Sequence, residues 1–135
     1  MTLRYMLDTN ICIYIAREKP REVKTHFERL RPGQVVMSAI TYGELSYGAA
    51  RSRQPRKSIA QLQELAHEIP VASLDSQTSE LYGEIRAKLE EQGRLIGNHD
   101  LWIAAHALAL DLTLVTNDER EFKRIPGLSV ENWTI

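Results

Sequence analysis

Residues 3–15, Leu-Arg-Tyr-Met-Leu-Asp-Thr-Asn-Ile-Cys-Ile-Tyr-Ile, contain the stretch that decides the fold. A mostly apolar strand over 3–7 ends in Asp8, and Thr9 and Asn10 are good helix N-caps before the apolar run that begins at Ile11. Asp8 is therefore expected where a buried strand passes into a helix. In open α/β sheets, ligands bind at this carboxyl-terminal edge of the strands. Other residues that reach the same edge are candidates for a shared site.

Length, composition and charge restrict the class of protein. The 135 residues suffice for one domain over 1–135, and 43% hydrophobic with 26% charged residues are typical of a globular chain. A net charge of -1 excludes nucleic-acid binding by overall charge, so such binding needs local clusters. Cys12 is the only cysteine, which excludes a disulfide framework and predicts a small buried side chain. We expect no signal peptide and no membrane span, and a cytoplasmic location.

Apolar spacing predicts strands that alternate with helices along the chain. Strands are expected over 3–7, 35–40, 71–74 and 112–116, with a short one near Val130. Helices are expected after Asp8, from Pro20 to Leu30, from 41 through Ala49, after the basic break at 51–57, from the N-cap Asp75 to Gly93, over 101–110 after a loop at 94–100, and from Glu119. This alternation predicts a three-layer α/β/α domain with a mostly parallel sheet, whose strand order the pattern does not give.

Four acidic residues are expected at the carboxyl edge of this sheet. Asp8 and Asp118 follow strands, Glu44 begins the helix after the second strand, and Asp100 heads the helix over 101–110. Two carboxylates about 4 Å apart repel by roughly 4 kcal/mol near a protein surface, so a cluster must hold protons or a cation. Oxygen ligands without soft partners favour Mg²⁺ or Mn²⁺, and two such ions could flank a scissile phosphate.

Each acid also has a purely structural explanation. Residues 41–44 match a capping box, Asp100 or Asn98 could cap the following helix, and Asp118 could belong to a turn. Asp8 is the hardest to explain in this way, because a carboxylate at the end of a buried strand needs a partner or a cation. Four acids at one edge together favour a site.

Four segments carry a family resemblance. They are residues 6–10 (Met-Leu-Asp-Thr-Asn), the helix start at Glu44, residues 96–106 (Ile-Gly-Asn-His-Asp-Leu-Trp-Ile-Ala-Ala-His) and residues 115–118 (Val-Thr-Asn-Asp). They resemble the motifs of PIN-domain ribonucleases, and more narrowly of the VapC toxins of bacterial toxin-antitoxin pairs. The resemblance spans essentially the whole chain. It implies that Asp8, Glu44, Asp100 and Asp118 are the catalytic, metal-binding acids and that Thr116 supports the cluster. Thr9 and Asn10, as the turn and helix cap after the strand, are expected to aim Asp8.

The same resemblance implies a fold, an activity and binding partners. It predicts a PIN-like fold, a Mg²⁺- or Mn²⁺-dependent endoribonuclease, an RNA substrate, a homodimer, and a small VapB-like antitoxin whose tail blocks the acidic site. Residues 42–49 and 97–107 are similar to the VapC branch that cleaves initiator tRNA in the anticodon region. Tyr42 and Leu45 could belong to a dimer surface or to the core.

The histidines favour hydrolysis by water over chemistry through the RNA 2′-hydroxyl, which would need a general acid and a general base. His26 and His67 fall on helices away from the expected edge, and His106 is expected to be packed and hydrogen-bonded. Only His99 is next to an acid. Hydrolysis by metal-activated water would leave a 5′-phosphate and a 3′-hydroxyl.

Basic and aromatic residues offer RNA contacts. Of the basic residues, Arg94 is the better candidate; Arg86 and Lys88 precede it, and a solvated loop explains the cluster of four at 51–57 slightly better than phosphate binding does. Trp102 and Tyr47 could stack on bases, but packing is the safer interpretation.

The residues argue against two other classes of function. An aspartate-nucleophile phosphatase or receiver domain would need a second acid two residues after Asp8 or a late lysine, and the chain has neither. A degenerate PIN-like binding module would have no reason to retain four acids at one edge.

Overall fold

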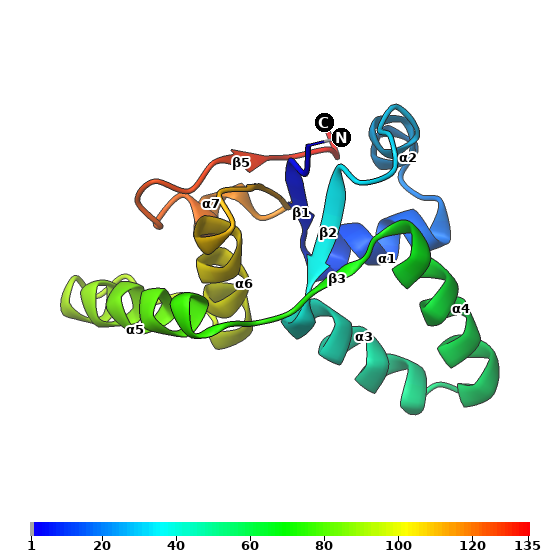
Figure 1. Ribbon diagram of the computed structural model, residues 1–135, viewed down its shortest axis with the longest axis horizontal. Coiled ribbons are helices and arrows are strands. Elements are labelled where there is room, and N and C mark those ends of the chain that lie inside the picture. Colours follow the sequence, from blue (N-terminus) through cyan, green and yellow to red (C-terminus); the bar gives the residue numbers. More distant parts are fainter. Residues whose placement is uncertain (1) are drawn as a thin grey trace.

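The computed structural model describes residues 2–135, in which helices cover both faces of a five-stranded sheet (Figure 1). The strands are β1 (Tyr5–Leu7), β2 (Val35–Ser38), β3 (Val71–Ala72), β4 (Thr113–Val115) and β5 (Val130–Glu131), in the order β3-β2-β1-β4-β5. All neighbouring pairs are parallel. The predicted α/β class is confirmed. Because β1 is central and the chain leaves it first to one side and later to the other, the topology switches at the carboxyl end of β1.

Seven helices connect these strands in the described residues. They are α1 (Thr9–Arg17), α2 (Arg21–Glu28), α3 (Ala39–Ala50), α4 (Pro55–Glu68), α5 (Ser76–Glu91), α6 (Asn98–Ala109) and α7 (Glu119–Phe122). None of the helices in residues 2–135 has the length and apolar content to cross a membrane.

Alternate residues of the strands face two separate cores, because successive side chains of a strand point to opposite faces. Met6 and Leu114 pack with buried residues of α5 and α6 on one face. Tyr5, Leu7 and Val115 pack with buried residues of α1 and α4 on the other. The sheet is therefore the middle of three layers, as predicted.

Two predicted helix starts are wrong. Thr9 and Asn10 do not cap α1; Asp8 does, and its Oδ1 accepts the Ile11 N–H at 2.9 Å. The capping box at 41–44 is also wrong, because α3 begins at Ala39 and Ser38 is its N-cap, with its Oγ accepting the Ile40 N–H at 3.1 Å. The apolar run over 35–40 therefore contains both the strand end and the first helical turn.

Other bounds differ by a few residues. The third strand ends at Ala72, α2 begins after Pro20, and α4 begins at Pro55, inside the expected basic break. The loop expected over 94–100 is shorter, because α6 begins at Asn98. Asp75 is the N-cap of α5, as predicted, and Gly93, just past its end, has a φ of +65° that favours glycine.

Candidate active site

Asp8 lies at the carboxyl end of the central strand. Its backbone N–H donates to the Val115 carbonyl at 3.0 Å, which aligns Asp8 with the end of β4. Its side chain is only 6% exposed. The side chain of Thr116, the first residue after β4, hydrogen-bonds the Asp8 carboxylate. The topological switch point therefore carries a buried acid held by the end of the neighbouring strand β4.

The surroundings of Asp8 disfavour its charged form. Its pKa is raised from 3.8 to about 6, mainly by burial, with smaller contributions from the charges of Asp118 and Glu44. The hydrogen bonds from Thr116 and from the Ile11 N–H oppose this shift. A buried carboxylate with this pKa is stabilised in its charged form by a cation or by added hydrogen-bond donors.

Asp100 is in the first turn of α6 and is half-buried. Burial raises the pKa of its carboxyl group, and the negative charges of Asp8, Glu44 and Asp118 raise it too. The structure thus brings together the four acids predicted at this edge. Asp100 does not cap α6, however, because the N-cap position is Gly97.

Glu44 connects three helices at this edge. Thr9 Oγ1 of α1 donates to Glu44 Oε1 at 2.7 Å, and His99 Nδ1 of α6 lies 3.3 Å from Glu44 Oε2. Glu44 is in the second turn of α3, not at the helix start that the sequence suggested. Its carboxylate is thereby fixed beside the first turns of α1 and α6.

Asp118 and Thr116, which follow β4, complete the acidic cluster. Thr116 is buried, and its Oγ1 accepts the Asp118 N–H at 3.0 Å. Asp118 is exposed and caps the short helix α7, with its Oδ1 accepting the Glu121 N–H at 3.3 Å. Asp118 is therefore both a cap and a member of the acidic cluster.

Glu121 is an acid of this cluster that the sequence did not single out. Its Oε1 accepts the Gly97 N–H at 3.0 Å. Burial raises its pKa, and contact with Asp118 and the charge of Asp100 contribute. The available signal was its position three residues after Asp118 on the charged helix.

The remaining predicted site residues lie at the margin. Asn10 is exposed in the first turn of α1, and Arg94 is exposed between α5 and α6. Arg86 pairs with Glu90 at 2.9 Å and is less available to phosphate. Lys88 is exposed.

Two predictions of packing are confirmed and one is wrong. His106 is buried, with Nδ1 2.8 Å from Ser38 Oγ and Nε2 3.1 Å from the Ser73 carbonyl. Trp102 is half-buried and stacks on Tyr82, with ring centroids 3.8 Å apart. Tyr47 does not pack inside, because 64% of it is exposed.

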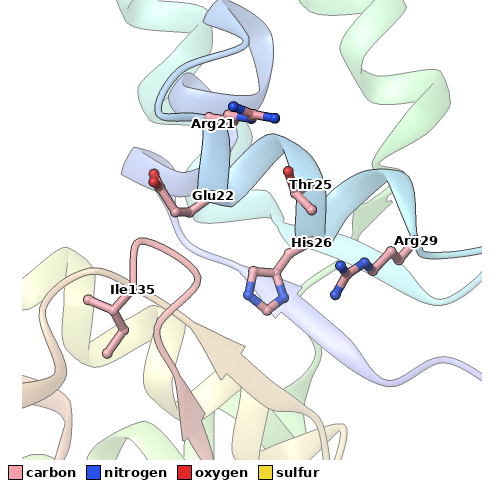
Figure 2. A pocket seen from close by; sticks show the side chains of 6 residues that line it. All are labelled: Arg21, Glu22, Thr25, His26, Arg29 and Ile135. Atoms are coloured by element: carbon pink, nitrogen blue, oxygen red, sulfur yellow. The ribbon is translucent and has the colours of Figure 1, made fainter.

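Two hollows flank the molecule. A groove of about 700 Å³ between α1, α3 and α4 has Thr9 and Glu44 in its lining, so it reaches one acid of the cluster. A smaller hollow of about 350 Å³ lies on α2 beside Ile135 (Figure 2), near the chain termini at the opposite edge of the sheet (Figure 1). Of these two hollows, the groove is the one that adjoins the acidic site, through Glu44.

The donor set fits a hard divalent cation. Every acid of the cluster offers carboxylate oxygens, and the nearby Cys12 thiol is buried on the core side of α1. In residues 2–135, no three His, Cys, Asp or Glu side chains already stand as a compact metal-binding group. The fit therefore rests on donor chemistry and on the raised pKa values of Asp8 and Asp100.

Comparison with known proteins assigns the family. Residues 5–128 match the PIN domain. The chain belongs to the PIN-domain family. The tRNA(fMet)-specific endonuclease VapC of Shigella flexneri is 41% identical over 132 residues, which are 98% of this chain and 99% of that relative. Ribonuclease VapC2 of Haemophilus influenzae is 40% identical over 131 residues, 97% of this chain and 98% of that protein.

A solved structure agrees with these relatives. VapBC-1 from nontypeable Haemophilus influenzae has a TM-score of 0.90 and 41% identity, and the alignment covers 100% of both chains. This PIN domain therefore belongs with the VapC ribonucleases, and the resemblance found in the sequence motifs is confirmed. The phosphatase alternative finds no support among these relatives.

Proposed function

We propose that the protein is a Mg²⁺- or Mn²⁺-dependent endoribonuclease that acts as the toxin of a toxin-antitoxin pair. The observation that carries the proposal is Asp8, a buried acid whose pKa is about 6 and which shares its strand edge with further carboxylates. Such a cluster is an unfavourable arrangement for folding alone, since like charges raise one another's free energy. A bound divalent cation would offset the repulsion between these carboxylates.

Asp8, Glu44, Asp100 and Asp118 would hold the metal, and Glu121 adds a fifth carboxylate beside them. A bound divalent cation would lower the pKa of the attacking water and balance the charge of the scissile phosphate. Thr116 and the Ile11 N–H orient Asp8, Thr9 orients Glu44, and the Gly97 N–H orients Glu121. These bonds hold carboxylates in place before RNA binds, which supports preorganised catalysis.

The products of this chemistry carry a 5′-phosphate and a 3′-hydroxyl. His99 is the one histidine at the acidic edge, and it is already engaged by Glu44. The other three lie on α2, α4 and inside the fold at Ser38, so no pair of histidines is available as general acid and base. Water activated at the acids is the nucleophile that remains.

The proposed substrate is initiator tRNA, cut in the anticodon region. Support comes from the 41% identical relative named as a tRNA(fMet)-specific endonuclease. Arg94, exposed in the segment that leads into α6, is the proposed phosphate contact beside the acids. The proposed setting is the cytoplasm, where this RNA is found.

The groove between α1, α3 and α4 is the proposed seat of an antitoxin segment. Its apolar lining includes Ile13, Leu45, Leu62 and Leu65. Its charged lining is mainly acidic, with Glu18, Glu64 and Glu68 beside one basic residue, Arg17. A segment with apolar and basic residues fits this lining, and by reaching Glu44 it would block the acids. The structure of VapBC-1 from Haemophilus influenzae, similar over its full length, supports a VapB-like partner. We also propose a homodimer, as the family resemblance implies.

The proposal is tested by brief induction in cells followed by sequencing of RNA ends. The wild-type protein should give a recurrent cut in initiator tRNA, and Asp8→Asn and Asp100→Asn should give none. Asp111→Asn is the matched control, because Asp111 is exposed in the turn before β4 with a φ of 56° that Asn tolerates well. Uniform RNA decay without a recurrent cut would contradict the tRNA substrate.

A further inference from the structure

A basic surface lies where α3 turns into α4, and we call it the arm tip. It consists of Tyr47, Arg51, Arg53, Arg56 and Lys57, all of them exposed. Figure 1 shows the turn between the two helices at the end that points away from the sheet. The arm tip is thus presented to solvent by a pair of packed helices rather than by a loose loop.

The charge of the arm tip is unopposed. The whole chain has 17 Lys and Arg against 18 Asp and Glu, yet the 19 residues from 45 to 63 contain four of the basic residues and no acidic one. In the part of the chain that the structure describes, no carboxylate lies within ion-pair distance of these four side chains. A nearly neutral protein therefore carries a concentration of positive charge on the arm tip.

The arm tip is continuous with the acidic site. Glu44, Tyr47 and Arg51 follow one another at spacings of three and four residues, so they share one face of α3. Seven residues of helix rise about 10 Å, roughly the length of three stacked nucleotides. A strand that passes the acids at Glu44 can therefore continue along α3 to the tip.

Tyr47 and Arg51 are arranged as a binding pair. Arg51 Nη1 donates to the Tyr47 hydroxyl at 3.0 Å, and Arg51 Cζ lies 5.3 Å from the centre of the Tyr47 ring. The guanidinium is held in place but keeps further N–H donors for an anion. The Tyr47 ring, 64% exposed, offers an aromatic face for stacking.

We propose that the arm tip binds the RNA substrate beside the cut, with its cations on the phosphate backbone and Tyr47 against a base. The inference rests on the proposed ribonuclease function and adds the surface that holds the RNA. In the lining of the neighbouring groove, the exposed acids Glu18, Glu64 and Glu68 outnumber the one basic residue, Arg17, which suits a basic protein segment. The arm tip has the opposite sign, so it suits a polyanion. The charge of each surface therefore assigns the groove to the antitoxin segment and the arm tip to the RNA.

The test compares two triple variants of the full chain. Arg53→Gln, Arg56→Gln and Lys57→Gln together remove three charges from the arm tip. Arg21→Gln and Arg29→Gln at the small hollow on α2 (Figure 2), together with Arg31→Gln just after α2, remove three exposed charges and serve as the matched control. The probes are an initiator tRNA transcript for cleavage, and the same transcript for binding in an Asp8→Asn background. Thermal unfolding of each variant checks that the fold is retained.

The arm-tip variant should raise KM for the transcript about tenfold with kcat unchanged, and the control should leave both unchanged. The slope of log affinity against log salt should fall by about 2 in the arm-tip variant only. Equal behaviour of the two triple variants would overturn the inference. Loss of the antitoxin complex with RNA binding intact would also overturn it and assign the tip to a protein partner. If the wild-type protein cleaves no RNA, the proposed function itself fails and the inference fails with it.

Discussion

Replacing Asp8 with Asn should stabilise the metal-free protein at neutral pH even though it removes a proposed catalytic acid. Burial is the largest cause that raises the pKa of Asp8 from 3.8 to about 6. Asn has nearly the same volume and is an equally good N-cap, so the bond from the Ile11 N–H can be retained. The substitution therefore removes the charge and leaves the packing and the cap.

The magnitude follows from the pKa difference between the folded and the unfolded chain. Two units correspond to about 3 kcal/mol, taking the ordinary value of 3.8 for the unfolded state. Below pH 3.8 the carboxyl group is protonated in both states and the charge costs nothing. Between 3.8 and about 6 the folded protein binds more protons than the unfolded chain, so the wild-type free energy of unfolding falls as the pH rises. Above about 6 the whole cost is present.

The assay is urea unfolding in EDTA, monitored by circular dichroism at several pH values. It compares the wild type, Asp8→Asn and the exposed-site control Asp111→Asn. The stability gained by Asp8→Asn over the wild type should grow from near zero at low pH to about 3 kcal/mol at neutral pH. Asp111→Asn should show no such pH-dependent gain. A pH-independent difference, or a loss of stability at neutral pH, would refute the reasoning that burial of charge at Asp8 is a cost.

Three further predictions concern the site and its support. Asp100→Asn should abolish RNA cleavage without lowering the melting temperature; an active variant would remove Asp100 from the site. Glu121→Gln keeps an acceptor for the Gly97 N–H but loses a charge, so activity or metal affinity should fall by about 10–100-fold. An unchanged Mg²⁺ titration would count against a role of Glu121 in metal binding. Ser38→Ala removes the cap of α3 and the partner of His106 Nδ1, so urea unfolding should show a loss of about 2–4 kcal/mol; a loss below this range would mean that water replaces both bonds.

The sheet edge was predictable because apolar strands and polar residues after them leave a clear pattern. Asp8 and Asp118 follow β1 and β4 directly, and parallel strands bring their carboxyl ends to one edge whatever their order. The strand order itself depends on which helix faces pack together, which periodicity along the chain does not encode. The convergence of the acids could therefore be predicted without the topology.

The helix start at α3 shows where local signals compete. Ser38 and Thr41 are both good N-caps, and Glu44 completes a capping box with Thr41. The structure uses Ser38, whose hydroxyl also lies 2.8 Å from His106 of α6. A contact across 68 residues of sequence decides between two caps that are locally equivalent.

The positions of Glu121 and Tyr47 could not be predicted from the sequence, for the same reason. Glu121 joins the cluster through the Gly97 N–H, 24 residues away, and Tyr47 is exposed because α3 projects from the sheet at that point. Each outcome depends on tertiary placement and not on the residue's neighbours in sequence. The acids after strands could be predicted; the contacts that complete the site could not.

Metal dependence of RNA cleavage is the most direct test of the chemistry proposed for the acidic cluster around Asp8. Purified protein is incubated with initiator tRNA in EDTA, and then with added Mg²⁺ or Mn²⁺, and the ends of the products are identified. The acidic cluster predicts no cleavage in EDTA, recovery with either ion, and products with a 5′-phosphate and a 3′-hydroxyl. Cleavage that persists in EDTA and leaves a 2′,3′-cyclic phosphate would contradict the account.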